Sequence, residues 1–236
     1  MEFTLLGAVA VAVALMYAVL RYEGGRTNAA DCTRDVWDGL VSAAVIGLIV
    51  GRLVAMVQAG TNPISHPGDI LIVRAGVDTV AASAAAVATY LVMTRRDTWW
   101  LADAAAPAGL AGLAGWHGGC LVRDACLGTS SDLPWAVAQT GSTVTRHPVE
   151  IYAAALLVVA AIGFLWWKRR RPRPGIIAAA AVATAALVRL ATEPMRPGLG
   201  GDQAWWYASA AAVGLGVIVW RVVTADTPDD PPAQAP

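Results

Sequence analysis

Charged residues are scarce in this chain of 236 residues. Asp, Glu, Lys and Arg together make up 14% of it, against about 25% in an ordinary soluble domain. Hydrophobic residues make up 57%, and the mean hydropathy is +0.55. A water-soluble core of this length does not need so much apolar surface. The composition therefore argues against a soluble globular protein and favours one embedded in a membrane.

The chain also lacks an excess of one charge and any paired cysteine motif. Its 17 basic and 17 acidic residues give a formal net charge of zero, which gives no support to nucleic-acid binding. The three cysteines, Cys32, Cys120 and Cys126, do not have the spacing of a zinc site, so we expect no metal and no cofactor. Cys120 and Cys126 either form a disulfide on an oxidising side of the membrane or remain free thiols, and their spacing leaves both open.

What the chain does contain is a series of long apolar runs. Crossing a bilayer takes about 20 apolar residues, and seven runs qualify: 3–20, 38–59, 70–93, 99–122, 149–167, 175–195 and 203–222. We therefore predict an all-α polytopic membrane protein with about seven transmembrane helices, in one domain over residues 1–223. Glu2 precedes the first run and basic residues follow it, as in a membrane helix rather than a signal peptide. The Pro-rich acidic residues 224–236 are expected to be disordered.

The basic residues between the runs predict the orientation. Cytoplasmic loops of membrane proteins carry an excess of Lys and Arg. The loops after the first, third, fifth and seventh runs hold eleven such residues, whereas the intervening loops hold three. The N-terminus is therefore expected outside and the C-terminus in the cytoplasm. Pairs of tryptophans at the ends of runs are expected to anchor the helices at the headgroup level; they are Trp99 and Trp100, Trp166 and Trp167, and Trp205 and Trp206.

Several ionisable residues lie where a membrane helix should carry no charge. A charge at the centre of a spanning helix costs roughly 2.5–3.5 kcal/mol, so such residues usually face a protein interior or a wet cavity. Arg52 has no acidic partner in its own run and is expected to face a cavity, while Arg74 and Asp78 are spaced to pair. Arg189 and Glu193 lie one helical turn apart, and they either neutralise each other or hold a ligand.

The three histidines have competing interpretations. His117 stands with Arg123 and Asp124 where the fourth run ends, and this group either binds an anion and moves a proton or is a solvated loop end. The Asp, Pro and glycines of the same run indicate close helix packing or a broken helix that lines a cavity. His147 before Pro148 is either a site residue or part of a helix start. His66 lies in a turn with two prolines and is expected to be solvated.

In their order along the chain, these motifs resemble the bacterial prolipoprotein diacylglyceryl transferases. Gly51-Arg52-Leu53 is similar to a Gly-Ala-Arg-Leu stretch of that family, and Ala102-Asp103 with Pro107 to its Ala-Asp-x-x-x-Pro. Residues 115–128 followed by Pro134-Trp135 resemble the family signature. The remaining matches are to His-Pro-x-x-x-Tyr and Arg-x-x-x-Glu-x-x-Arg; they are His147, Pro148, Tyr152, Arg189, Glu193 and Arg196.

The resemblance implies a site and a reaction. It implies transfer of a diacylglyceryl group from phosphatidylglycerol to the lipobox cysteine of a preprolipoprotein signal peptide, at the bacterial plasma membrane. The catalytic candidates are His117, His147, Arg189 and Glu193. Arg side chains would hold the phosphate, and a histidine would promote formation of the nucleophilic thiolate. The candidates for substrate binding are Arg52, Gly119, Gly128, Tyr152 and Arg196.

The signature also departs from the family pattern. His117, Cys120 and Ala125 stand where the family has arginine, asparagine and glutamate, and residues 74–78 replace a His-Gly-Gly stretch. Whether the chain is an enzyme is therefore left open. The alternatives are a non-catalytic membrane protein that binds phosphatidylglycerol or another anionic phospholipid, and a small transporter. The sequence gives no indication of the oligomeric state.

Overall fold

The fold is described by a computed structural model that covers residues 3–27, 30–65, 68, 77–94, 98–123, 126–196 and 204–224. Three expectations fall outside these residues: the solvated turn at His66, the pairing of Arg74 with Asp78, and the disordered tail. The grouping of His117 with Arg123 and Asp124 is also outside them, because Asp124 and the side chain of Arg123 are not described.

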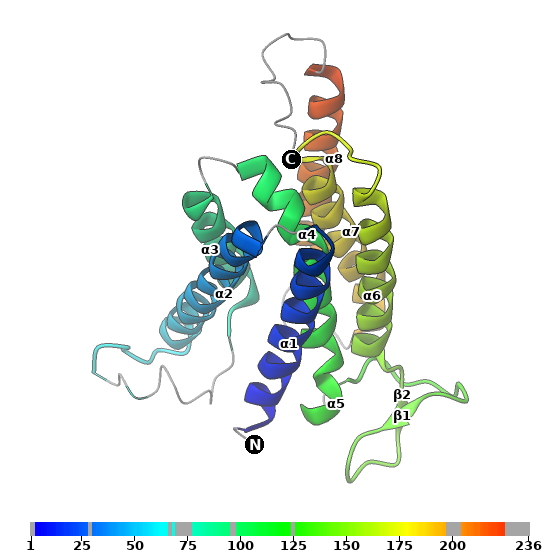
Figure 1. The fold of residues 1–236 in the computed structure, drawn as a ribbon. Coiled ribbons are helices and arrows are strands. Elements are labelled where there is room, and N and C mark those ends of the chain that lie inside the picture. Colours follow the sequence, from blue (N-terminus) through cyan, green and yellow to red (C-terminus); the bar gives the residue numbers. More distant parts are fainter. Residues whose placement is uncertain are drawn as a thin grey trace.

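Long helices that alternate in direction make up almost all of the molecule (Figure 1). In chain order they are α1 (Phe3–Thr27), α2 (Ala30–Gln58), α3 (Thr79–Met93), α4 (Thr98–Gly118), α6 (Val149–Lys168), α7 (Ile176–Thr192) and α8 (Ala204–Val223). The short helix α5 (Cys120–Arg123) follows α4, and the 3₁₀ helix η2 (Glu193–Met195) follows α7. The predicted all-helical, multi-pass membrane fold is thus confirmed.

Five of these helices are long and apolar enough to cross a membrane. The corresponding segments are Gly7–Gly24, Val36–Gln58, Val149–Lys168, Ile176–Met195 and Ala204–Val223. Helix α3 has 15 residues in the described part, or about 22 Å of helix, which is less than the roughly 30 Å of a hydrocarbon core. Helix α4 is 21 residues long but carries Asp103 and His117. The prediction of seven crossings therefore exceeds the five supported by length and composition.

One element is absent from the prediction. A two-stranded antiparallel hairpin, β1 (Val137–Ala138) and β2 (Thr145–Arg146), joins the end of α5 to the start of α6. Val137 pairs with Arg146 in its register. The strands are too short to give an alternating pattern in the sequence, so this segment is expected only as a loop.

Helix α4 lies at the centre of the helix packing. It contacts α1, α2, α6 and α7, and its Leu110, Ala111 and Ala114 belong to one buried cluster with residues of α6 and α7. The helix continues through Pro107 without a break. Of the two interpretations of this run, the structure therefore supports close packing and contradicts a break at Pro107; the helix is interrupted only at Gly119, between α4 and α5.

Small residues allow the close approach. A Cβ atom on Gly115 would lie 2.7 Å from the Ala12 Cα atom of α1, and one on Gly119 would collide with Ala8 one turn away. Gly47 and Gly51 of α2 face α3 in the same manner. Such small-residue contacts are the usual means by which helices pack within a bilayer.

Asp103 has a structural role at the opposite end of α4 from His117. Its two carboxylate oxygens accept the backbone N–H groups of Gly175 and Ala178, each at 2.7 Å. Gly175 is the N-cap residue of α7 and Ala178 lies in its first turn, where N–H groups have no partner within the helix. Asp103 therefore caps α7 and fixes its start against α4.

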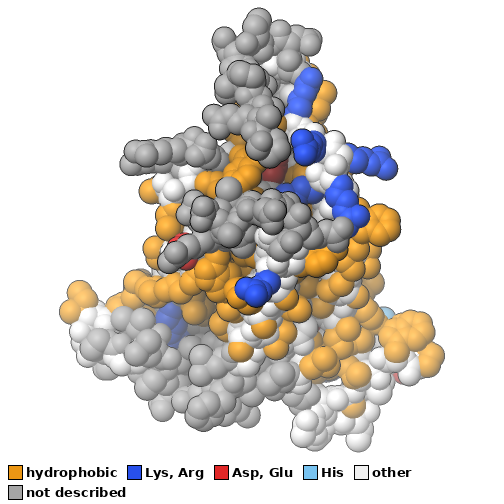
Figure 2. All heavy atoms as spheres, viewed as in Figure 1, with side chains coloured by type: hydrophobic (Ala, Val, Ile, Leu, Met, Phe, Trp, Pro, Cys, Tyr) orange, Lys and Arg blue, Asp and Glu red, His pale blue; other side chains and the backbone are white. Residues whose placement is uncertain are grey.

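The surface agrees with a membrane environment. Figure 2 shows a visible face that is mostly hydrophobic over the middle of the helices, with Lys and Arg side chains gathered toward the upper end. Exposed apolar side chains occur on every long helix, among them Val159 at 68%, Val213 at 64% and Trp166 at 69%. In water such a surface would be unstable, but it suits contact with lipid.

Candidate functional site

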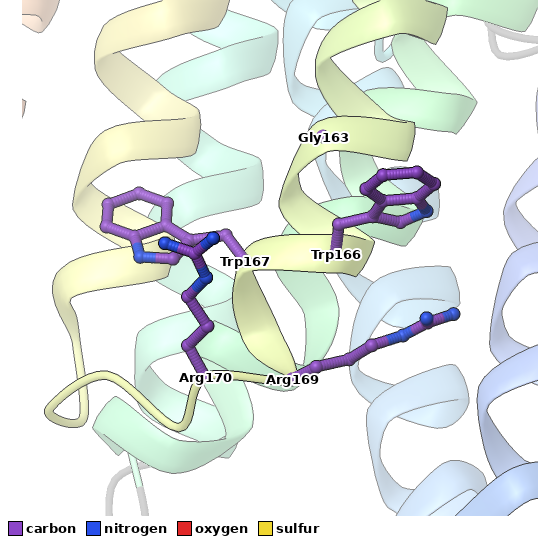
Figure 3. Close-up of a pocket in the computed structure, with 5 residues that line it drawn as sticks. All are labelled: Gly163, Trp166, Trp167, Arg169 and Arg170. Atoms are coloured by element: carbon purple, nitrogen blue, oxygen red, sulfur yellow. The ribbon is translucent and has the colours of Figure 1, made fainter.

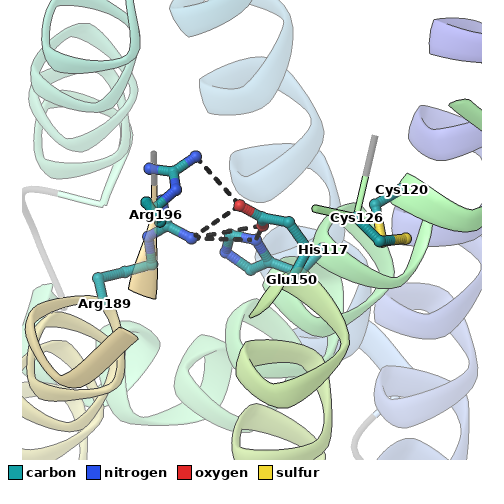
Figure 4. The surroundings of a disulfide bond; sticks show 6 residues. All are labelled: His117, Cys120, Cys126, Glu150, Arg189 and Arg196. Carbon is teal, nitrogen blue, oxygen red and sulfur yellow. Dashed lines mark hydrogen bonds and ion pairs between the residues drawn. A yellow bond between two sulfur atoms is a disulfide. The ribbon is translucent and has the colours of Figure 1, made fainter. Parts of the chain in front are cut away.

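A buried carboxylate, that of Glu150, lies at the centre of the candidate site. Glu150 is in the first turn of α6 and is 9% exposed. One of its oxygens lies 2.5 Å from Nδ1 of His117, and the other lies 3.0 Å from Nη2 of Arg196. Nη1 of Arg189 is 3.4 Å from the first of these oxygens. Three segments distant in sequence thus converge on one residue, as Figure 4 shows.

His117 is held in a defined orientation. It lies in the last turn of α4 and is 7% exposed. Because an ionised carboxylate can only accept, Nδ1 of His117 carries the proton in this hydrogen bond and Nε2 is left as the proton acceptor. A hydrogen bond from one ring nitrogen to a carboxylate fixes the tautomer and the ring orientation of a histidine. This arrangement is suited to a general base.

The two arginines differ in how accessible they are. The Arg189 side chain, on α7, is 13% exposed, and its guanidinium lies 5.6 Å from the centre of the Tyr207 ring of α8. The Arg196 side chain follows η2, is 35% exposed, and also lies 3.6 Å from Glu193. Arg196 is therefore better placed than Arg189 to contact a ligand at the surface of the cluster.

The pairing of Arg189 with Glu193, one of the two sequence interpretations, is not what the structure shows. Arg189 pairs with Glu150, whereas Glu193 pairs with Arg196. Glu193 is the C-cap of α7, and its N–H still donates to the Arg189 carbonyl one turn earlier, so the backbone spacing is the expected one. The two side chains are drawn apart by other charges, Arg189 to Glu150 of α6 and Glu193 to Arg196 after η2.

The cluster is close to neutral overall. Arg189 and Arg196 are balanced by Glu150 and Glu193, and His117 adds a charge only when it is protonated. Balanced charges explain how ions can be tolerated within apolar helices. A proton taken up by His117 would leave one positive charge uncompensated, so the site would then favour a bound anion.

A second polar group lies at the start of α6. The Trp135 indole Nε1 donates to the Tyr152 hydroxyl at 2.7 Å, and Nδ1 of His147 lies 3.5 Å from the same oxygen. Gly128 donates its N–H to the His147 carbonyl at 2.7 Å, and a Cβ at Gly128 would collide with Val149 and the Met195 carbonyl. Thr129 donates to the Met195 carbonyl at 2.7 Å. These backbone hydrogen bonds connect the segment that contains His147 with the segment that contains Arg196.

A disulfide closes the segment next to His117. Cys120 and Cys126 are bonded, and both are buried. Of the two alternatives for this pair, the structure has the disulfide. Figure 4 shows it on the side of the cluster away from the two arginines. It joins the end of α4, which carries His117, to the segment that contains Gly128.

Not all the predicted site residues are brought into this cluster. His117, Arg189, Glu193 and Arg196 are within it, while His147 and Tyr152 form the neighbouring group. Gly119 and Gly128 act through close packing rather than through contact with the charges. Arg52 is 3% exposed on α2, whose principal neighbour is α3. Its assignment to substrate binding stays a prediction.

Glu150 is the residue that sequence reasoning missed. Glu150 stands two residues after Pro148 at the start of the fifth run, where an acidic residue is common and does not stand out. The available signal was electrostatic: two arginines in the sixth run and its end, with only Glu193 nearby in sequence, needed a further acidic partner from another run. Glu150 is the acidic residue that begins the fifth run.

Comparisons with known proteins agree with the motif order. The sequence profile of the prolipoprotein diacylglyceryl transferase family matches residues 2–224. Among curated relatives, a phosphatidylglycerol–prolipoprotein diacylglyceryl transferase of Bordetella avium is 27% identical over 173 residues, covering 70% of this chain and 65% of that protein. The protein of the same name from Cupriavidus necator is 31% identical over 150 residues, covering 60% and 55%. The matched part of the chain therefore spans 65% and 55% of the length of these two relatives.

Proposed function

Because this chain belongs to the prolipoprotein diacylglyceryl transferase family, we propose that it transfers a diacylglyceryl group from phosphatidylglycerol to the lipobox cysteine of a preprolipoprotein. In this reaction a C–S bond forms between the cysteine and a glycerol carbon. The C–O bond from that carbon to phosphate breaks, and glycerol phosphate leaves. The observation that carries the proposal is the buried cluster in which Glu150 joins His117 to Arg189 and Arg196.

His117 is the proposed general base. A thiol attacks only as its thiolate, so its proton must be accepted within hydrogen-bond reach. Nε2 of His117 would take this proton, and the Glu150 carboxylate at Nδ1 would stabilise the resulting imidazolium. The proton can then pass to the glycerol phosphate, which gains a negative charge as it leaves.

Arg196 is the proposed phosphate ligand, with Arg189 behind it. The donor phosphate carries one negative charge and the leaving phosphate carries two, so a guanidinium that binds it stabilises the transition state more than the ground state. The Arg196 side chain is the more exposed of the two arginines, at 35% against 13% for Arg189. Glu193 would orient Arg196, while Arg189 keeps Glu150 ionised.

His147 and Tyr152 are proposed to line the approach of the acceptor peptide. They lie at the start of α6 beside the hairpin, where Trp135 is 58% exposed and Val144 is 46% exposed. An apolar surface with a few polar groups suits the extended segment around a lipobox cysteine. We assign Tyr152 to binding rather than to proton transfer, because its hydroxyl already accepts from Trp135.

The proposed topology has seven crossings of the bacterial plasma membrane, with the N-terminus outside and the C-terminus in the cytoplasm. The alternation of helix direction in Figure 1 supports this arrangement. The disulfide next to the cluster supports an oxidising location for that end. With this orientation the cluster and the hairpin face the side on which lipoproteins are modified.

A non-catalytic phospholipid-binding protein is the second candidate. The observation that favours it is that Cys120 and Ala125 replace residues of the family signature, and that Cys120 is held in a disulfide. Such a protein would keep the arginines as a phosphate site without using His117 as a base. The two candidates therefore differ in the role of His117: diacylglyceryl transfer requires it as a base, whereas phospholipid binding does not.

Complementation separates these candidates. The chain should restore growth to a bacterial strain depleted of its own transferase, and His117→Gln and Arg196→Gln should each abolish the rescue. Gln139→Ala, an exposed position in the hairpin turn, serves as the matched control and should rescue fully. Failure of the unaltered chain to rescue, with phosphatidylglycerol still retained by the purified protein, would overturn the enzyme and leave the lipid-binding candidate.

A further inference from the structure

A cavity lies at the end of α6 opposite to Glu150. Its volume is about 450 Å³, and it is lined by Gly163, Trp166, Trp167, Arg169 and Arg170. Sixteen residues separate Trp166 from Glu150, which corresponds to about 24 Å along a helix. The cavity is therefore separate from the candidate active site and belongs to the other leaflet of the bilayer.

Each arginine is paired with an indole. Figure 3 shows Trp166 and Arg169 extending to one side of the helix end, and Trp167 and Arg170 to the other. This follows from their spacing, because residues three apart lie on the same side of a helix. Trp167 is fixed by the Phe164 ring, 5.7 Å away between centres. One turn earlier, no heavy atom lies within 4 Å of the position that a Cβ on Gly163 would take. Because glycine has no side chain, the helix surface is open at this point.

Several basic residues at this end are already paired within the protein. Lys168 donates to Glu23 at 2.7 Å, Arg173 to the Val222 carbonyl at 3.4 Å, and Arg221 to the Pro174 carbonyl at 3.0 Å. Within the residues that the structure describes, the backbone N–H groups of Arg169 and Arg170 donate to Trp166 and Trp167, but no hydrogen bond or ion pair is found for their guanidinium groups. The general excess of positive charge in cytoplasmic loops explains why arginines are here. It does not explain why these two side chains line a cavity and have no protein partner.

We propose that this cavity binds the headgroup of an anionic phospholipid from the leaflet at this end of α6, which is cytoplasmic in the proposed orientation. The guanidinium groups of Arg169 and Arg170 would each bind the headgroup from its own side of the cavity through charge-assisted hydrogen bonds. The indoles lie at the depth of the glycerol ester region, which is the preferred position of tryptophan in membranes. An acyl chain would lie along the surface left open at Gly163. The lipid would be a bound structural ligand and not the donor in the reaction.

Native mass spectrometry of the full chain tests this site. The protein in detergent is stripped of lipid and titrated with phosphatidylglycerol or phosphatidylcholine. All measurements are repeated in an Arg196→Gln background, which removes the proposed donor site. A charge-assisted hydrogen bond to a phosphate contributes roughly a ten-fold gain in binding. Arg169→Gln and Arg170→Gln should therefore each weaken phosphatidylglycerol binding about ten-fold in both backgrounds, with little change for phosphatidylcholine.

Arg171→Gln is the matched control, because Arg171 is exposed in the same loop but does not line the cavity. An equal loss for Arg171→Gln would overturn the site and leave only a general effect of charge. Displacement of the lipid by millimolar inorganic phosphate would also overturn it, in favour of a simple anion site.

A third result would do the same: if deletion of residues 226–236 abolished the effect of Arg169→Gln, the acidic tail would be the true occupant. Loss of rescue by the chain in complementation would affect only the proposed transferase activity.

Discussion

His117 donates its Nδ1–H to the Glu150 carboxylate at 2.5 Å, across the interface of α4 and α6. This bond makes the orientation of the proposed base depend on a residue of another helix. It also explains how one acidic residue can serve three partners, since Arg189 and Arg196 use the same carboxylate.

Glu150→Gln should reduce transfer by about 100-fold or more. The amide keeps the shape of the side chain but cannot balance two guanidinium groups, and it no longer stabilises a protonated His117. The rate is measured with labelled phosphatidylglycerol and a lipobox peptide. Glu193→Gln is the control, because among the described residues the Glu193 carboxylate forms an ion pair with Arg196 only, at 3.6 Å. An equal loss in both variants would contradict the central place of Glu150.

Arg189→Leu should destabilise the protein by about 3 kcal/mol, because it removes one partner of a buried ion pair. The double variant Arg189→Leu with Glu150→Leu should recover most of that stability, since both charges are gone. It should still be inactive in transfer. Thermal unfolding in detergent measures the stability. Recovery of activity along with stability would mean that the pair has no chemical role.

The disulfide predicts a simple count of thiols. In denaturant without reductant, one of the three cysteines, Cys32, should react with a maleimide, and all three should react after reduction. Replacing Cys120 and Cys126 with alanine should cost about 2 kcal/mol of stability, the value expected for a loop of this size. Cys32→Ala is the control and should leave stability unchanged. Three reactive thiols before reduction would contradict the bond.

Gly119→Ala should destabilise the protein by about 1–3 kcal/mol, because the added methyl group would collide with Ala8 of α1. Gly109→Ala in α4 is the matched control. No atom lies within 4 Å of its Cβ position, and alanine favours helix more than glycine does. Unfolding temperatures of the two variants should therefore move in opposite directions. A neutral Gly119→Ala would show that α1 and α4 do not meet here.

Reporter fusions test the orientation. A reporter fused after residue 172 should be cytoplasmic, because that loop carries the densest group of basic residues. A reporter fused after residue 140, in the hairpin turn, should be outside. The reverse pattern would place His117 and the disulfide in the cytoplasm, where lipoprotein modification does not occur.

Much of the fold could be predicted because hydropathy reports directly on contact with lipid. Runs of apolar residues mark α1, α2, α6, α7 and α8 well. The continuity of α4 through Pro107 could not be predicted. Whether a proline breaks a membrane helix depends on how its neighbours pack, and here α4 is enclosed by α1, α6 and α7. The hairpin is too short to leave a pattern.

The basic residues of the candidate site could be predicted, but the acidic residue that they share could not. The isolated charges at His117, Arg189 and Arg196 were visible because each is costly in an apolar run. Their partner was not, since Glu150 is 33 residues from His117 and 39 from Arg189. Pairing across helices depends on the three-dimensional packing, whereas spacing along one helix offered Glu193 as a partner for Arg189, and the structure does not show that pair.

The cap that Asp103 provides at Gly175 has a consequence for how this protein can vary. Helix α7 is tied to α4 at its start by Asp103 and near its end by the contacts of Arg189 with Glu150 and His117. One inserted residue between these points would turn Arg189 by about 100° and shift it by about 1.5 Å. The number of residues between Gly175 and Arg189 is therefore fixed by geometry. Substitutions along the lipid-facing side of α7 can accumulate, but insertions and deletions within it are excluded.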